Sequence, residues 1–447
     1  MSTPASVIRF GADRGRHAAS GGVRFNPAPW SMVALTIAWV VLMLRQIPCR
    51  EGADYFPSMC YTDITSLFYW RGLKDGLVPY FQSDLEYPVL TGFLIDLTRR
   101  LTNLVGGRTE PGLPDDQVAN AAGIFFGVNA MVLFALFVLL VWAHLKMSRP
   151  RDALMVAASP LIAAEALINW DALVVAHTAL ALLAWSRKRP GWTGIWLGLA
   201  IAAKLYPLLI LIPLAVLCLR AGRWRAFFIT AGATAASWLA VNLHVYLLAP
   251  KGWLNFWTFN VGRGGDLGSI WYALSLSGVQ VDGVSTLVAA ILVVGALGIG
   301  ALLLLAPQRP RLAQGVFLIV VLFLLVNKVY SPQYSLWLLP LLVLARPRWV
   351  DWIVFTVGEL IYFVAIWGHL DGALLSGAGE QDRVYIAAVF IRIAVQLWLS
   401  GRIVLDAWHP ARDIVRVGGL DDPDGGLLDG RPDAPWLGRL RAALSRG

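Results

Sequence analysis

The sequence predicts an all-α integral membrane protein that crosses the membrane many times. Of the 447 residues, 57% are hydrophobic and only 15% are charged, whereas soluble domains are about 45–50% apolar and about 25% charged. The 20 tryptophans and 12 tyrosines suit a membrane protein, because amphipathic rings collect at its interfaces. The net charge of +9 is spread over short clusters between apolar runs. We therefore expect contact with membrane lipids and no nucleic-acid partner.

The cationic clusters predict the topology. The positive-inside rule places them in the cytoplasm, and the first and last belong to two tails, residues 1–28 and 406–447. Both termini are therefore expected in the cytoplasm. The clusters between the tails lie at residues 146–151, 187–189, 220–225, 309–311 and 346–348.

Apolar segments between these clusters are the predicted spans of a transmembrane domain over residues 29–405. Several are shorter than the roughly 20 residues that cross the hydrocarbon. Short helices in a bundle indicate a cavity, since backbone that faces lipid must stay hydrogen-bonded. The expected spans number about 12 and lie near residues 30–44, 120–143, 153–168, 172–185, 192–203, 205–219, 226–249, 284–305, 312–326, 335–345, 349–367 and 384–405.

One further apolar segment, residues 88–105, carries Asp96, Arg99 and Arg100. If it crossed the membrane, the 146–151 cluster would lie on the wrong side. It is therefore predicted to be an amphipathic helix at the outer interface.

The C-terminal tail is predicted to be largely disordered. Residues 418–435 are rich in Asp, Gly and Pro and show no apolar periodicity. Such a composition cannot bury enough apolar surface to offset the ordering of the chain.

The same topology gathers the polar motifs on the extracytoplasmic side. Ionisable residues at membrane depth are costly and usually mark a functional site. The candidate residues are Asp63, Glu86, Asn169, Asp171, Lys204, Tyr206, Arg263, Lys328, Tyr330 and Gln333.

Several candidates also have purely structural interpretations. Asp63 and Asp171 precede predicted helices and are suited to N-caps. Lys204 can extend its ammonium to the interface; otherwise it needs a partner or an anionic ligand. Glycines around Arg263 would let backbone amides approach an anion.

The histidines and cysteines do not predict a metal site. No His or Cys pair has ligand spacing, and no phosphate loop or hydrolase motif is present. No cofactor is expected. Cys49 and Cys60 fall in one predicted outer loop, where oxidising conditions allow a disulfide.

Carboxylates and cations at membrane depth suit transfer from a lipid phosphosugar. A carboxylate takes the proton from an acceptor hydroxyl as it attacks the anomeric carbon. Lysine or arginine neutralises the charge that builds on the departing phosphate.

Four separated motifs carry a family resemblance. These are CYTDITSLFYWRGLKDGLVPYFQSDLEYPVLTG, NWDALVVAHTALALLAWSRKRP, GLAIAAKLYPLLIL and NKVYSPQYSLWLLPLLVLA. In this order, and over residues 30–405, the chain resembles glycosyltransferase family 87. That family has the C-type fold of membrane glycosyltransferases and includes polyprenol-phosphate-mannose-dependent α-mannosyltransferases of the plasma membrane.

The resemblance implies an inverting, metal-independent transfer to an envelope lipid or glycan, from a polyprenyl-phosphate sugar. It implies Asp63 as the base, and donor-phosphate contacts from the motifs of Lys204 and Lys328. Asn169, Asp171 and Gln333 would contact the sugar. Mannose is the expected sugar, with a pentosyl donor as the alternative.

A second carboxylate in the same loop, Glu86, leaves the choice of base open. Glu86 is also placed to pair with Arg71 or Lys74.

The competing function is a transporter or flippase for a lipid-linked sugar or small solute, which would bind phosphate without chemistry. Transporters often show two related halves and a site at the midplane. This sequence has no convincing internal repeat, and its polar residues lie toward one face.

Overall fold

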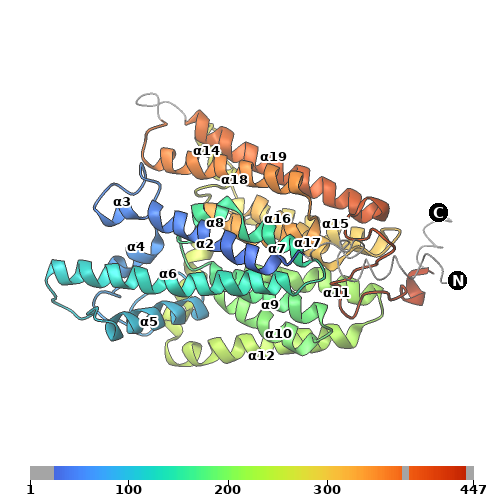
Figure 1. Ribbon diagram of the computed structural model, residues 1–447, viewed down its shortest axis with the longest axis horizontal. Helices are drawn as coiled ribbons and strands as arrows, with labels where there is room; N and C mark the ends of the chain where they lie inside the picture. Colours follow the sequence, from blue (N-terminus) through green and yellow to red (C-terminus); the bar gives the residue numbers. More distant parts are fainter. Residues whose placement is uncertain (1–24, 375–381, 439–447) are drawn as a thin grey trace.

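The computed structural model describes residues 25–374 and 382–438. Within these ranges the chain is helical, with one isolated β-bridge between Pro79 and Ser83, so the all-α prediction is confirmed (Figure 1). The principal helices are α2 (Pro27–Arg45), α3 (Ile47–Arg50), α4 (Asp63–Trp70), α5 (Val89–Leu104), α6 (Asp115–Leu145), α7 (Ala153–Ala157), α8 (Pro160–Glu165), α9 (Ala172–Ser186), α10 (Pro190–Ala203), α11 (Leu211–Arg220), α12 (Trp224–Leu248), α13 (Pro250–Gly262), α14 (Ile270–Leu276), α15 (Val284–Leu305), α16 (Leu312–Val326), α17 (Ser335–Ala345), α18 (Trp349–Leu370) and α19 (Arg383–Trp408).

Six helices are long and apolar enough to cross a membrane: α2, α6, α12, α15, α18 and α19. Four shorter apolar segments accompany them, at Ala172–Ser186, Tyr206–Arg220, Leu312–Val326 and Pro332–Ala345. Length and composition therefore support a membrane protein. The total of about 12 spans remains a prediction.

Two predicted spans are interrupted by proline. The helix expected over 153–168 is divided between α7 and α8, with Ser159 capping α8 just before Pro160. The segment over 205–219 begins as the 3₁₀ helix η2 (Tyr206–Ile210), with Pro207 in its first turn. Proline lacks the N–H of the helical ladder and starts helices better than it continues them.

The predicted amphipathic helix over 88–105 is α5. Its charged residues are satisfied within the protein, because Asp96 accepts from both Arg99 and Arg100 at 2.7 and 2.6 Å. Arg99 also donates to Thr109 at 3.2 Å. At 16 residues the helix is short for a span, and its place at the outer interface remains a prediction.

Helices α10 and α12 pack closely through two glycines. A Cβ on Gly194 or Gly198 would lie 2.3 or 2.4 Å from the carbonyl oxygen of Thr230 or Thr234. Small residues one turn apart let helix backbones approach each other in membrane proteins. This contact fixes the end of α10, where Lys204 lies.

Residues 409–438, called here the C-terminal segment, differ from the expected disorder. Asp413 pairs with Arg311 at 2.7 Å, Asp421 with Arg309 at 2.9 Å, and Asp433 with Arg220 at 2.9 Å. Its composition resembles a disordered chain, but its aspartates neutralise buried arginines contributed by distant helices. The predicted N-terminal tail lies mostly outside the described residues, as do residues 439–447.

The C-terminal segment contacts several of the predicted cytoplasmic clusters of cations. Besides Arg220, Arg309 and Arg311, it contacts Ser148, whose hydroxyl donates to Asp424 at 2.6 Å, and Arg348, which donates to the Arg412 carbonyl at 2.8 Å. Four of the predicted cytoplasmic clusters therefore meet at one end of the molecule. In Figure 1 this end lies at the right, whereas α3 and α4 lie at the left.

Candidate functional site

A disulfide anchors the segment that leads to Asp63. Cys49 and Cys60 are bonded, with their Cα atoms 6.0 Å apart, which settles the pairing left open by the sequence. Arg45 at the end of α2 donates to the Met59 carbonyl and, at 3.3 Å, to the Ala163 carbonyl. The loop before α4 is thereby fixed to α2 and α8.

The start of α4 is capped by Thr62 and not by Asp63. The Thr62 hydroxyl accepts from the Ile64 amide at 3.2 Å and donates to the Leu167 carbonyl at 2.5 Å. The Asp63 amide donates to the Ile168 carbonyl at 2.7 Å. The carboxylate of Asp63 is therefore not needed as an N-cap.

Two tyrosines hold the Asp63 carboxylate. Tyr61 donates its hydroxyl at 2.9 Å and Tyr87 at 2.7 Å, one to each oxygen. Burial raises the pKa of Asp63 above its ordinary value, although the hydrogen bonds from Tyr87 and Tyr61 act in the opposite direction. The residue is half-buried, and within residues 25–374 and 382–438 no cation lies at ion-pair distance from it.

Glu86 is occupied by an ion pair. Arg71 donates to its two carboxylate oxygens at 2.8 and 3.1 Å. This is one of the two structural partners that the sequence offered. The geometry favours Asp63 over Glu86 as the carboxylate that is free to accept a proton.

Lys204 has a buried partner. Directly after α10 the backbone turns extended, and the ammonium donates to Asp171 at 2.8 Å. Aromatic rings surround it, with the centroids of Tyr87, Tyr334 and Trp337 at 5.1, 5.2 and 5.5 Å. The side chain is only 17% exposed, so it does not extend to the interface.

Asp171 lies between this lysine and an indole. Its second oxygen accepts from Trp337 Nε1 at 3.0 Å, and its side chain makes no capping bond to α9. The Asn169 side-chain oxygen accepts from the Asp171 amide at 2.9 Å. Both residues are buried, so the turn before α9 is rigid.

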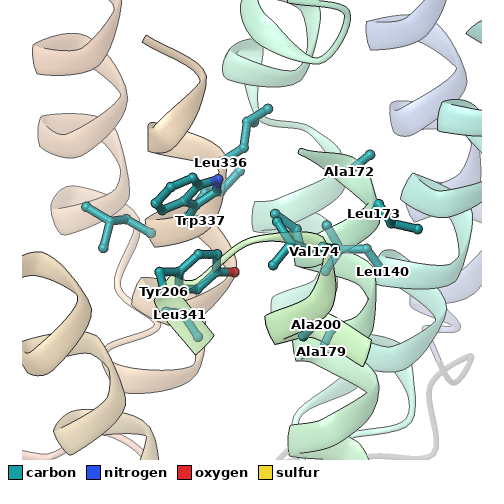
Figure 2. Packing of buried hydrophobic residues seen from close by; sticks show 14 of the residues in the cluster. Leu140, Ala172, Leu173, Val174, Ala179, Ala200, Tyr206, Leu336, Trp337 and Leu341 are labelled. Carbon is teal, nitrogen blue, oxygen red and sulfur yellow. The ribbon is translucent and has the colours of Figure 1, made fainter. Parts of the chain in front are cut away.

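Tyr206 packs behind Trp337 and does not line the site. Its ring stacks on Trp337 with centroids 4.4 Å apart and planes 14° apart, as Figure 2 shows. Its hydroxyl lies 3.3 Å from that of Thr178, and it is 2% exposed. Tyr334 stacks on the same indole at 3.9 Å.

These contacts join the four sequence motifs into one network. It runs from Asp63 through Tyr87 to Lys204, then to Asp171 and Trp337. Sequence reasoning missed Tyr61, Tyr87 and Trp337 as members. Tyr61 and Tyr87 lie beside predicted candidates, but only the fold shows that their hydroxyls meet one carboxylate.

Arg263 and Lys328 lie in adjoining loops, each with partners of its own. Arg263 pairs with Asp266 at 2.6 Å, and the Asp266 amide donates to the Lys328 carbonyl at 2.8 Å. The Lys328 ammonium donates to the carbonyls of Asn260 and Val261, at 3.2 and 3.1 Å, at the end of α13. The two cations therefore do not join the Asp63 network directly.

The loop of Arg263 needs its glycine. Gly268 has a φ of +76°, and a Cβ there would lie 1.9 Å from the Tyr330 carbonyl oxygen. Its amide donates to the Tyr385 hydroxyl at 2.7 Å. Only glycine fits this close approach without strain.

Tyr330 and Gln333 follow Lys328 in the chain, and their side chains have different surroundings. Tyr330 is buried, with the Arg392 guanidinium 3.4 Å from its ring centroid and Gln396 donating to its hydroxyl at 2.6 Å. It fixes the turn that presents Gln333 and Tyr334. Gln333 is 5% exposed, and its Oε1 has no hydrogen-bond partner within the described ranges. Buried polar atoms usually have a partner, so this oxygen is a candidate hydrogen-bond acceptor for a ligand.

A narrow aromatic groove begins beside this network. It has a volume of about 10 Å³, and its lining includes Tyr87, which contacts Lys204, and Leu205, which follows Lys204 in the chain. The other lining residues are Tyr80, Pro88, Val89, Ile201, Trp238, Asn242, Trp253, Phe256 and Trp257. Its polar residue Asn242 is already engaged, since it accepts from Trp253 at 3.0 Å.

Comparisons with known proteins bear on about half of the chain. No curated protein matches it. A match to a protein-family model covers residues 113–327. This region contains Asn169, Asp171, Lys204 and Arg263, whereas Asp63 and Lys328 lie outside it. Residues 113–327 of this chain match the model of glycosyltransferase family 87.

Proposed function

We propose that the protein is a membrane glycosyltransferase that moves a sugar from a polyprenyl phosphate to an envelope lipid or glycan. Mannose is the first donor sugar to test. The site would act on the extracytoplasmic side of the plasma membrane. The observation that carries the proposal is the half-buried Asp63 carboxylate, held by two tyrosines and linked through Tyr87 to Lys204. The match to family 87 supports the class of reaction.

Asp63 is suited to act as the general base. The acceptor hydroxyl gives its proton to Asp63 as its oxygen forms a bond to the anomeric carbon. The bond between that carbon and the phosphate oxygen breaks, and its electron pair leaves with the polyprenyl phosphate. Attack from the face opposite the phosphate inverts the anomeric centre. The raised pKa of Asp63 makes its carboxylate a stronger base near neutral pH.

Lys204 would stabilise the departing phosphate. Asp171 and three aromatic rings hold its ammonium, so it needs little reorganisation when negative charge develops. Preorganised charge of this kind is usually a large contribution to catalysis. Arg263 is proposed to add a second cation, and Lys328 to fix the loops around it.

Asn169, Asp171 and Gln333 are proposed to face the sugar. The buried, unpartnered Oε1 of Gln333 would accept from a sugar hydroxyl. Tyr206 and Tyr330 position this set from behind.

The aromatic groove would have to widen to receive the first isoprene units, because its present volume is about 10 Å³. Its lining comes from α5, α10, α12 and α13 and includes Tyr87 and Leu205. A lipid tail in this groove would bring its phosphate toward Lys204.

The test is transfer by purified protein with radiolabelled polyprenyl-phosphomannose, an envelope lipid extract and a chelator. We expect label in a new lipid or glycan with the wild type and none with Asp63→Asn. A polyprenyl-phosphopentose in a parallel assay decides the sugar. Saturable donor binding without transfer from either donor would instead support a transporter or flippase, which liposome flipping by wild type and Asp63→Asn alike would establish.

A further inference from the structure

A cluster of cations lies at the end of the molecule away from Asp63, in a cleft formed by the turn before α18, the last turns of α19 and the segment after it. Its lining contains four arginines and a single carboxylate. Arg346 and Arg348 come from the turn before α18, Arg402 from α19, and Arg412 from the 3₁₀ helix η4 (Pro410–Arg412). The remaining lining residues are Leu405, Asp406, Ala411, Ile414 and Val417.

The charge of this cleft is not balanced. Asp406 already pairs with Arg346, which also pairs with Asp351 at 2.5 Å. In the part of the chain that the structure describes, Arg348, Arg402 and Arg412 have no carboxylate at ion-pair distance. The Nε of Arg348 is buried and has no hydrogen-bond partner there.

Neighbouring arginines outside the cleft, unlike these three, are paired with carboxylates among the described residues. At the same end of the molecule, Arg220, Arg309 and Arg311 each meet an aspartate of the C-terminal segment. A cleft that leaves three guanidinium groups unpaired beside them has a site for an anion. Guanidinium groups bind phosphate oxygens through paired N–H donors.

The surroundings of the cleft indicate a lipid. Helices α18 and α19 are both candidate membrane spans, and the cleft lies just before the start of α18 and at the end of α19. Large apolar side chains flank it and are exposed, including Trp349 (53%), Val350 (67%) and Leu405 (42%). Arginines next to lipid-facing residues form the kind of pocket that holds anionic headgroups on the cytoplasmic side.

We propose that the cleft lined by Arg346, Arg348, Arg402 and Arg412 binds a phosphate group, namely the headgroup of an anionic phospholipid in the leaflet opposite the transfer site. The lipid phosphate accepts from Arg348, Arg402 and Arg412, and its acyl chains lie along α18 and α19. This site is independent of the proposed transfer reaction.

The test measures binding of phosphatidylglycerol to the purified protein in detergent, by native mass spectrometry across a lipid titration. Phosphatidylcholine is the neutral comparison. The variant Arg402→Gln/Arg412→Gln removes two cations that make no ion pair among the described residues. Arg187→Gln/Arg225→Gln is the matched control, since it removes two exposed arginines from other clusters expected on the same side.

We expect the wild type and the control to prefer phosphatidylglycerol, and the Arg402/Arg412 variant to bind it about tenfold more weakly or worse, since each cation near a lipid surface contributes about a factor of five. The Arg348→Lys variant keeps the charge but loses paired donors, so it should bind at an intermediate level. Unchanged affinity in the Arg402/Arg412 variant, an equal loss in the control, or equal binding of phosphatidylcholine by the wild type would overturn the proposal.

A competition arm distinguishes the source of the phosphate. Inorganic phosphate or glycerol phosphate should not displace the lipid at equal concentration, because they lack acyl chains to pack against the helices. Displacement at equal concentration would overturn the lipid assignment in favour of a soluble phosphate ester.

Discussion

The two ends of the molecule both bury charged side chains, but they satisfy them differently. At the end of the molecule that holds the C-terminal segment, Arg311 makes two hydrogen bonds to Asp413. It makes two more to the carbonyls of Leu344 and Ala345. At the opposite end, Asp63 receives two hydroxyl donors, and none of the described residues places a cation at ion-pair distance from it. Asp63 is only partly buried, whereas Arg311 and Asp413 are buried.

This difference determines which of these charged groups could act on a ligand. A buried ion pair whose donors and acceptors are all used cannot bind a substrate without breaking. A carboxylate held by neutral hydroxyls keeps its orientation and can still take a proton. The ion pair of Lys204 and Asp171 is intermediate, because it is buried but adjoins the groove.

The largest effect is expected at Asp63. Asp63→Asn keeps an oxygen for a tyrosine hydroxyl but removes the base, so transfer should fall by about 100-fold or more in kcat. Glu86→Gln is the matched control and should stay near the wild-type rate, because it loses only a partly exposed pair with Arg71. The reverse pattern in single-turnover assays would identify Glu86 as the base.

At the end of the molecule that holds the C-terminal segment, Arg311→Gln should lower the free energy of unfolding by about 3 kcal/mol, because it leaves the buried Asp413 with only a longer pair, at 3.9 Å, to Arg416. Denaturant unfolding in mixed micelles measures this. Arg187→Gln, an exposed arginine, should unfold like the wild type. If Arg311→Gln did so too, the C-terminal segment would not contribute to stability.

The intermediate pair predicts two separable effects. Lys204→Met leaves Asp171 unpaired and should destabilise the protein by roughly 3 kcal/mol, besides weakening donor binding. Adding Asp171→Asn should restore most of the stability, since neither charge then remains, but not the donor affinity. Restored affinity for the lipid phosphosugar in the double variant would mean that Lys204 has only a structural role.

The smallest effect concerns the pH profile. Asp63 acts when ionised, so kcat/KM should fall as the pH drops through its pKa, which burial raises. The Tyr87 hydroxyl stabilises the ionised form and lowers that pKa. Tyr87→Phe should therefore move the acidic limb to higher pH, by roughly up to one unit.

Tyr80→Phe is the comparison for this profile. The Tyr80 hydroxyl donates to the carbonyls of Tyr87 and Pro88 and does not touch Asp63. The acidic limb of the kcat/KM profile of Tyr80→Phe should therefore stay at the wild-type pH. A limb that moved equally in both variants would show that the shift does not report on Asp63.

The helices were largely predictable because apolar periodicity and cationic clusters are local signals. The predicted spans 312–326 and 335–345 coincide with α16 and α17. The predicted spans 153–168 and 205–219, which contain a Ser-Pro and a Tyr-Pro, matched the observed helices less well. Local patterns identify a helix but do not show where proline divides it.

Some residues of the network were candidates from the sequence, but the contacts between them were not predictable. Sequence reasoning identified Asp171 and Lys204 separately, but their pairing depends on how α9 and α10 pack. It grouped Lys328 with the donor cations, whereas the structure places its ammonium on the α13 carbonyls. The C-terminal segment was missed because its aspartates find their partners only in the folded protein.

The pairing of early arginines with late aspartates has a consequence for synthesis. Arg220 precedes Asp433 by 213 residues, and Arg311 precedes Asp413 by 102. When α11 and α16 are synthesised, the aspartates that pair with these arginines have not yet been made. Until then another partner, such as water, must satisfy the guanidinium groups. This end of the bundle is therefore completed last, after the helices that carry Asp171 and Lys204 have been made.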